Sequence, residues 1–290
     1  MSNKTLIGKD NYLFLINDTG RELEVHCNNL NIIKDNKLSQ YNFNNYCIVI
    51  FPNKSYLYRD FLPPSYDAKY RPAFELYKSK LNNKIIDGYE ILKGEKDVYY
   101  KTDTHINLKG NYIIYKKFID KINNLFDLTL LPKQINIQSK TCVLNQLKYG
   151  ICDLTWPKNL GEQKLEDIKD VYFYSDDLTD FYNVYKIQKS KNILFLSYEL
   201  LDKTEMLEEN NQIVDWNIIS NYIIYIKNAD KEYCKKKVII FYDSFLLNIL
   251  PLYFDLFYEV FMIKTVYNNG LINLIKPDYI FEFRVERFLA

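Results

Sequence analysis

Histidine is nearly absent from this chain, which has only His26 and His105 among its 290 residues. Any reaction that needs an imidazole must therefore use one of these two side chains. His26 lies in a polar stretch, with Glu24 two positions before it. His105 has Asp103 at that spacing, just before a segment with helical periodicity. The scarcity of histidine thus directs attention to the pair Asp103 and His105.

Other absences exclude several classes of protein. The five cysteines form no CxxC pair, and two histidines cannot build a usual zinc cluster, so we expect reduced thiols and no metal site. The formal net charge is only +1, with basic and acidic residues interleaved, so nothing suggests a nucleic-acid partner. The most apolar stretch, residues 245–263, contains Asn248, Pro251, Asp255 and Glu259. It therefore predicts a helix followed by a strand and no membrane span.

Apolar runs of different length and period predict an α/β fold. Residues 46–51 form a continuous apolar run stopped by Pro52, which suits a strand buried on both faces of a parallel sheet. Residues 108–126 place apolar side chains at helical spacing, with Asn107 as a plausible N-cap. The pattern also predicts short strands within 6–15 and at 84–87, 98–100, 171–174, 193–196, 222–226, 237–242, 258–263 and 278–283, and helices near 70–82, 244–256 and 268–275.

The end of the chain alternates strand, helix, strand, helix and strand. Such an alternation implies right-handed crossovers and a parallel sheet. We therefore expect one domain over residues 1–290, with three layers around a central, mostly parallel sheet. Residues 130–230 fit this pattern less regularly and are expected to form an insertion or an elaborated face.

Ser244 is the best candidate for a nucleophile. It lies between an apolar strand pattern and a helical pattern, where nucleophilic serines are often displayed. A serine hydroxyl needs a base to accept its proton, and the base needs an acid to fix its tautomer. In an extended segment Asp103 and His105 point to the same side, so the carboxylate could hold Nδ1 while Nε2 faces Ser244. Main-chain N–H groups at the start of the helix could then meet a developing oxyanion. Each feature alone also has a structural explanation. In an Asp-x-His triplet the aspartate often caps a helix beside a hydrogen-bonded histidine, and a serine between a strand and a helix is often only the N-cap of that helix.

These segments and their flanks share a pattern that runs through nearly the whole chain. The matching residues are Gly8 to Phe14, Ile50 to Tyr58 with Leu62 and Pro63, Tyr100 to Asn107 with Gly110, Asp243 to Phe245, and Lys276 to Asp278 with Glu286 and Arg287. The pattern resembles the alginate O-acetyltransferase group of SGNH-hydrolase-like proteins, in which the Asp-His pair also precedes the serine. Cys152-Asp153-Leu154 is similar to a Gly-Asp-Leu segment of that group. Two residues depart from the pattern of the group: Ile106 stands where Trp is usual, and Tyr242 stands where Gly or Arg is usual.

The resemblance implies an SGNH-hydrolase-like fold and an enzyme that transfers acetyl groups to glycan hydroxyls. Ser244 would be the nucleophile, His105 the base and Asp103 the residue that orients the base. Lys54 would lie near the substrate, although a turn that packs the sheet edge is the commoner reason for such a lysine. Glu286 and Arg287 are read as a salt bridge at the end of the chain. The partners implied are a glycan acceptor, an acyl donor and a polysaccharide synthesis complex, with no cofactor.

Three functions are compatible with the pattern. The first is O-acetylation of a bacterial surface polysaccharide, such as a capsule, or of its precursor. The second is removal of acyl groups from a glycan, and the third is glycan binding by a catalytically silent relative. No signal peptide follows Met1, so the sequence as it stands predicts a cytoplasmic protein, whereas a truncated chain would fit a periplasmic or membrane-associated one.

Overall fold

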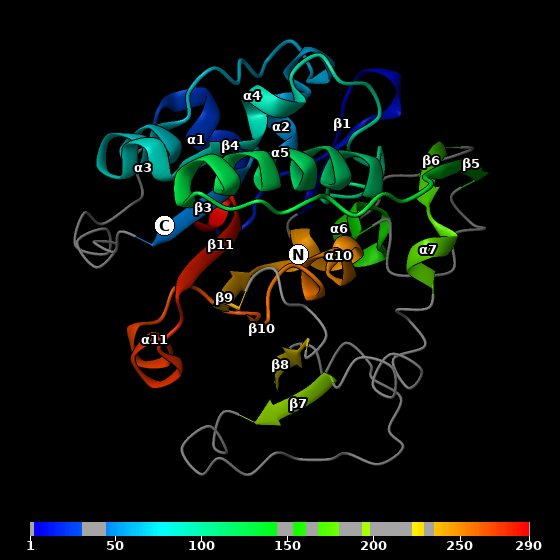
Figure 1. Ribbon diagram of the computed structural model, residues 1–290. Helices are drawn as coiled ribbons and strands as arrows, with labels where there is room; N and C mark the ends of the chain where they lie inside the picture. The colour runs from blue at the N-terminus through cyan, green and yellow to red at the C-terminus, as the bar shows by residue number, and fades with distance from the viewer. Residues whose placement is uncertain are drawn as a thin grey trace.

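The computed structural model describes residues 3–30, 45–143, 153–160, 168–179, 193–197, 222–228 and 235–289 (Figure 1). Its central sheet has seven strands in the order β4-β3-β11-β9-β10-β8-β7. Their bounds are β3 Tyr46–Phe51, β4 Ile85–Asp87, β7 Ile193–Ser197, β8 Tyr222–Lys227, β9 Lys237–Tyr242, β10 Glu259–Ile263 and β11 Tyr279–Val285. The strands from β4 to β10 pair in parallel, and β8 and β7 continue the sheet in antiparallel pairing. The fold is therefore mixed α/β with a mostly parallel sheet, as predicted.

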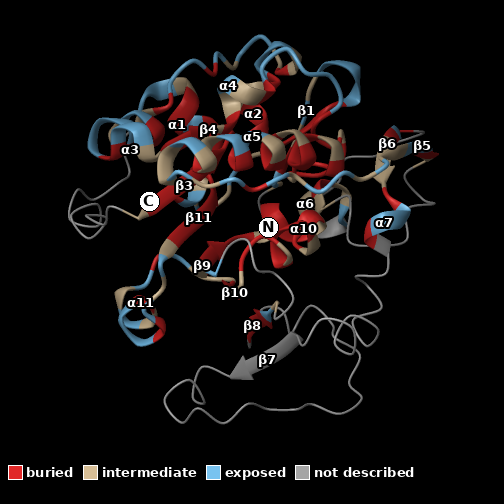
Figure 2. Ribbon diagram, viewed as in Figure 1, coloured by how far each residue is buried: buried red, intermediate tan, exposed pale blue. Residues whose placement is uncertain are grey.

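Alternate residues of β3 enter two different hydrophobic clusters, because successive side chains of a strand point to opposite faces. All six residues of β3 are buried, as its continuous apolar run predicts. Val49 and its odd-numbered neighbours pack with helix α5 (Leu108–Phe126). Ile48 and its even-numbered neighbours pack with helices α3 (Pro72–Leu81) and α11 (Asn269–Ile275). Buried residues thus pack against both faces of the sheet. Figure 2 shows β3 and β11 coloured mainly as buried.

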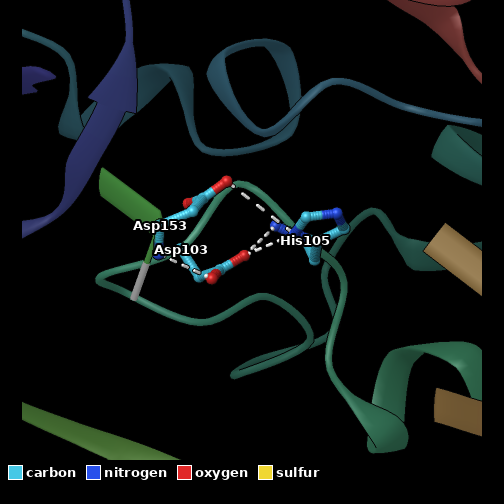
Figure 3. A group of neighbouring side chains, drawn as sticks. All are labelled: Asp103, His105 and Asp153. Carbon is cyan, nitrogen blue, oxygen red and sulfur yellow. Dashed lines mark hydrogen bonds and ion pairs between the residues drawn. The ribbon is translucent and has the colours of Figure 1, made fainter. Parts of the chain in front are cut away.

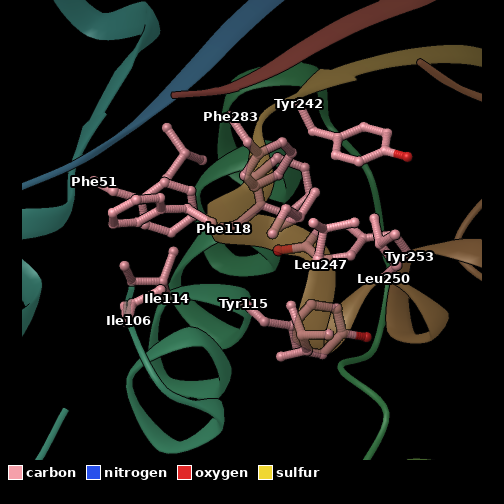
Figure 4. Close-up of a cluster of buried hydrophobic side chains, with 14 of the residues drawn as sticks. Phe51, Ile106, Ile114, Tyr115, Phe118, Tyr242, Leu247, Leu250, Tyr253 and Phe283 are labelled. Carbon is pink, nitrogen blue, oxygen red and sulfur yellow. The ribbon is translucent and has the colours of Figure 1, made fainter. Parts of the chain in front are cut away.

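The larger cluster contains aromatic rings from both the sheet and α5 (Figure 4). The ring of Phe118 in α5 lies 5.1 Å from that of Phe283 in β11, which lies 5.0 Å from that of Tyr253. These distances are within the range in which tilted aromatic pairs attract each other. Ile106, which departs from the pattern that the sequence resembles, is fully buried in this cluster.

Two short ribbons and several short helices complete the described chain. Strands β1 (Thr5–Ile7) and β2 (Leu13–Leu15) form the predicted antiparallel pair. Strands β5 (Gln138–Val143) and β6 (Lys169–Tyr174) form a second ribbon, so the predicted strand at 171–174 lies outside the central sheet. The remaining α-helices are α1 Glu22–Asn28, α2 Lys54–Leu57, α4 Gly88–Leu92, α6 Pro157–Leu160, α7 Asp176–Thr179 and α10 Pro251–Phe254.

Two predicted elements differ from the structure. Residues 98–100 form no strand; Tyr99 makes a single bridge to Ile106, and Val98 accepts a hydrogen bond from the N–H of Asn107 at 3.0 Å. The segment thus closes the loop 98–107 on itself, and sheet pairing is replaced by contacts within the loop. Residues 244–256 form a 3-10 helix, Ser244–Ile249, followed by α10. Pro251 lacks an N–H and crowds the preceding turn, which explains the interruption.

Gly110 lets α5 approach the loop 98–107 closely. The side chain of Asn107 accepts a hydrogen bond from the N–H of Gly110 at 3.1 Å and caps the helix, as predicted. A Cβ atom on Gly110 would lie 2.6 Å from the carbonyl oxygen of Val98 and 2.7 Å from Cγ1 of Ile106. The first of these is a main-chain atom and cannot turn away.

Gly110→Ala is therefore expected to lower the free energy of unfolding by about 1–3 kcal/mol, as overpacking typically does. Gly270→Ala is a matched control in the first turn of α11, because its Cβ would meet only the side-chain oxygen of Asn268, at 3.2 Å. Urea denaturation of both variants measures the difference. Equal stability of the two would show that the contact with Val98 is not restrictive.

Candidate active site

Three strands of the parallel sheet end at the same edge and deliver polar residues to it. Lys54 follows β3, Ser244 follows β9 and Arg287 follows β11. Asp243 fixes the turn that carries the serine: its Oδ1 accepts from the N–H of Phe245 at 2.9 Å and its Oδ2 from the N–H of Val285 at 2.7 Å. Ligands of open α/β sheets bind at this carboxyl edge.

Ser244, His105 and Asp103 lie together at this edge. The Oγ of Ser244 is 2.8 Å from Nε2 of His105, across 139 residues of sequence. The Nδ1 of His105 is 2.6 Å from Oδ1 of Asp103. The His105 side chain is 30% exposed and that of Asp103 only 2%. A serine hydroxyl, an imidazole and a buried carboxylate are thus hydrogen-bonded in series.

Asp103 reaches His105 through a turn instead of the expected extended segment. Its Oδ1 also accepts from the main-chain N–H of His105 at 2.8 Å, as an aspartate does in an Asx turn. Its Oδ2 accepts from the main-chain N–H of Asp153 at 2.9 Å. Burial disfavours this carboxylate, but the hydrogen bond and charge of His105 outweigh it and lower the pKa of Asp103 to about 2. Asp103 is therefore ionised near neutral pH.

The N–H groups next to Ser244 differ from the expected arrangement. The N–H of Phe245 is bonded to Asp243 and so does not face an incoming ligand. The following 3-10 helix has six residues, so its dipole adds little. The main-chain N–H of Ser244 itself remains the candidate donor to an oxyanion.

Lys54 anchors the loop that carries His105. Its buried Nζ donates to the carbonyl oxygens of Leu13 at 2.7 Å, Lys101 at 2.7 Å and Asp103 at 3.0 Å. An ammonium group has three hydrogens, so these carbonyls use all of them. Burial lowers the pKa of Lys54 to about 8, with Asp170 and Asp103 acting in the opposite direction. These contacts favour an anchoring role, and the expected contact with substrate stays a prediction.

Four residues to which the sequence analysis assigned no role in the site hold the loop 98–107 and the turn that carries Ser244. Asp170 accepts from the N–H and Oγ1 of Thr102 at 2.9 and 2.7 Å. Asp153 accepts from the N–H and Oγ1 of Thr104 at 2.8 and 2.6 Å. Asn248 donates to the carbonyl oxygen of Ile106 at 3.0 Å. Asn111 donates to the carbonyl oxygen of Phe245 at 2.7 Å and to Oδ1 of Asn248 at 2.6 Å. Two of them gave a signal in the sequence: Asn248 as a polar residue within an apolar stretch, and Asp153 as the middle residue of the Cys-Asp-Leu segment.

Comparison with known proteins finds no matching family model and no matching curated protein. Solved structures do match. PatB1 of Bacillus cereus is 16% identical with a TM-score of 0.57, over 100% of this chain and 98% of that one. A second structure of PatB1, with a sulfonyl adduct, is also 16% identical with a TM-score of 0.57, over 99% and 97%. A DHHW family protein from Eubacterium siraeum is 14% identical with a TM-score of 0.55, over 100% and 93%.

The chain shares the fold of these proteins. At such low identity the likeness establishes the fold alone, and the roles of individual residues must come from the geometry of this chain. The matches extend over nearly the full length of PatB1. Within the described residues, no helix is long and apolar enough to cross a membrane.

Glu286 and Arg287 form buried ion pairs with residues distant in sequence. Glu286 bonds to Nε of Arg71 at 2.8 Å, and Nη1 of Arg287 lies 3.1 Å from a carboxylate oxygen of Glu22. The expected salt bridge at the end of the chain thus has different partners. The guanidinium of Arg287 lies 5.1 Å from the ring of Phe245, which brings a positive charge next to the serine turn.

Asp103, His105 and Asp153 form a group of potential metal ligands, whose ligand atoms lie within 4.8 Å of one another. Their oxygens and the Nδ1 atom are already joined by the hydrogen bonds described above, and Thr104 bonds both oxygens of Asp153. This donor set is therefore satisfied as a hydrogen-bond network. Cys152, the first residue of the Cys-Asp-Leu segment, lies outside the described residues.

Lys54→Met keeps the length of the side chain and removes its three hydrogen bonds. Because three carbonyls would lose a charged donor, we expect the free energy of unfolding to fall by about 2 kcal/mol or more. Lys9→Met is the control, since Lys9 donates to the carbonyl of Asp60 at an exposed position. Thermal and urea denaturation of both variants test this. A loss no larger than that of Lys9→Met would contradict the anchoring role.

The presence of only two histidines allows a direct titration of His105. Burial opposes the imidazolium, but the hydrogen bond and charge of Asp103, with the charge of Asp153, raise the pKa of His105 above its usual value. NMR should therefore show this ring protonating at a pH above about 6.5. Asp103→Asn should lower that pKa, and His26→Gln assigns the resonances. A ring that titrates below 6.5 in the unmodified protein would contradict the electrostatic account.

Proposed function

We propose that the chain is a serine-dependent O-acyltransferase that acetylates hydroxyls of a bacterial surface polysaccharide or its precursor through an acyl-Ser244 intermediate. The observation that carries the proposal is the contact of 2.8 Å between Oγ of Ser244 and Nε2 of His105. A serine alone is a weak nucleophile near neutral pH, and a base at this distance can accept its proton as a bond to carbon forms.

In the first half-reaction, Nε2 of His105 takes the proton of Ser244 while Oγ attacks the acyl carbonyl of the donor. The tetrahedral intermediate collapses, the bond to the leaving group breaks, and the imidazolium returns the proton to that group. The acyl group is then an ester on Ser244. Asp103 keeps the proton of the neutral ring on Nδ1 and stabilises the imidazolium.

In the second half-reaction, His105 removes the proton of an acceptor hydroxyl. The acceptor oxygen attacks the acyl ester, Oγ of Ser244 leaves, and the imidazolium returns its proton to the serine. The products are an ester on the acceptor and the free enzyme. The exposed part of the His105 side chain, 30%, is where an acceptor can approach.

Different observations support different parts of this proposal. The geometry supports acyl transfer through a serine, whereas the acetyl group and the glycan are supported by the resemblance of the sequence segments around Asp103 and Ser244. The same resemblance supports a three-layer SGNH-hydrolase-like arrangement as one domain. A glycan acceptor, an acyl donor and a synthesis complex as partners, and the compartment where the reaction takes place, belong to the proposal as well.

An esterase is the second candidate, because the exposed edge of His105 is equally open to water. Water would then replace the sugar hydroxyl in the second half-reaction. The distribution of the acyl group between water and added oligosaccharide separates the two. Transfer to none of a panel of oligosaccharides, with steady hydrolysis, would favour the esterase.

Release of the chromophore from p-nitrophenyl acetate tests the nucleophile. Ser244→Ala should lower kcat/KM by about 10³-fold or more, because removal of a member of such a triad has effects of this size. Ser79→Ala is the control, since Ser79 is exposed and donates to the nearby carbonyl of Leu76. Equal hydrolysis by the unmodified protein and Ser244→Ala would contradict the proposal.

A further inference from the structure

A second carboxylate lies beside the ring of His105. An oxygen of Asp153 is 3.9 Å from Nδ1, while Asp103 lies on the same nitrogen at 2.6 Å (Figure 3). The side chain of Asp153 is 25% exposed, so it is partly shielded from water. The proposed mechanism assigns it no role.

Asp153 is joined to the segment 103–105 by several hydrogen bonds. Its two carboxylate oxygens accept from the N–H and the hydroxyl of Thr104, at 2.8 and 2.6 Å. Its own N–H donates to the Oδ2 of Asp103 at 2.9 Å. Asp153 therefore fixes the two residues that precede His105 and directs Oδ1 of Asp103 to the ring.

The charges that face the ring of His105 come from several segments. Asp103 lies on the same loop, Asp153 on a separate segment, and Ser244 contributes a neutral hydroxyl. The guanidinium of Arg287 acts in the opposite direction to the two acids. The ring of Phe245, 5.0 Å away, covers part of the imidazole without charge. Two acidic side chains and one guanidinium group therefore act on the charge of the His105 ring.

We propose that Asp153 is a positioning residue for His105: it holds the loop through Thr104 and favours the imidazolium that forms when Ser244 loses its proton. This inference rests on the proposed function. A negative charge within about 4–6 Å of an imidazole stabilises its charged form, and Asp153 lies at the near end of this range. Burial and the charge of Asp103 raise the pKa of Asp153, whereas the hydrogen bonds from Thr104 favour its ionised form.

Asp170 provides a matched control on the same loop. It accepts from the N–H and Oγ1 of Thr102 at 2.9 and 2.7 Å, as Asp153 does from Thr104. Asp170 is buried, with 4% exposure, whereas the side chain of Asp153 is 25% exposed. Asp103 and Asp153 are the acids that raise the pKa of His105 most. Asp153→Asn and Asp170→Asn therefore make similar changes to loop anchoring but different changes to the charge at the ring.

The experiment compares the pH dependence of kcat/KM for p-nitrophenyl acetate in these two variants. Asparagine can still accept from the N–H of Thr104 but carries no charge. The acidic limb, where protonation of His105 stops the reaction, should move down by about one pH unit in Asp153→Asn. It should stay in place in Asp170→Asn, even if both variants lose thermal stability equally. Asp153→Ser is a second neutral variant should Asp153→Asn fail to fold.

The same comparison by NMR titration of His105 in a Ser244→Ala background needs no activity. It separates failure of this inference from failure of the proposed function. If hydrolysis does not depend on Ser244, the proposed function is wrong, and the titration still tests Asp153. An unchanged His105 titration in the Asp153 variant, or an equal shift in the Asp170 variant, would overturn the inference.

Discussion

The loop 98–107 depends on polar side chains from distant parts of the chain for its shape, and the position of His105 depends on the loop. A loop of this length without strand pairing must satisfy its main-chain N–H and C=O groups elsewhere. Lys54 bonds the carbonyls of Lys101 and Asp103, while Asp170 and Asp153 bond N–H groups on the same segment. The imidazole is thus held in place before any ligand binds, which is a requirement for efficient catalysis.

The acidic side chains that anchor this loop also affect the pKa of His105. The carboxylate of Asp103 is ionised, lies against the ring and is itself held by N–H groups of His105 and Asp153. Within a partly buried site these charges act more strongly than they would in water. Folding and reactivity are therefore coupled: a substitution that loosens the anchoring also changes the proton affinity of the base.

The sequence predicted the features that depend on local pattern. The run Tyr46–Phe51 was recognisable as a buried strand because both of its faces are apolar, and α5 because its spacing and its cap at Asn107 agree. The pairing of Asp103 with His105 followed from short spacing, although a turn brings them together. Two predictions were wrong. The apolar run at 98–100 carries no sign that it lacks a partner strand, and the helix at 244–256 was expected to continue through Pro251 but is interrupted there.

The sequence did not reveal the residues whose roles depend on distant partners. Asp153 and Asp170 are 49 and 68 residues from the threonines that they bond. The segment Cys152-Asp153-Leu154 was noticed in the sequence without a role for its aspartate, and no local pattern marks Asp170. Asn111 lies within an ordinary helical segment, and only the structure shows that it connects α5 to the serine turn. Lys54 was noticed for its place after a strand, yet its use of all three donors on main-chain carbonyls is a tertiary feature.

The central claim is that His105 activates Ser244, and covalent trapping tests it most directly. Phenylmethylsulfonyl fluoride, or a fluorophosphonate, reacts with a serine hydroxyl whose proton is removed by a neighbouring base. Mass spectrometry of the intact protein and its peptides should find one adduct, on Ser244, that forms slowly or not at all in His105→Ala. An adduct at another residue, or equal labelling of Ser244 without His105, would contradict the account.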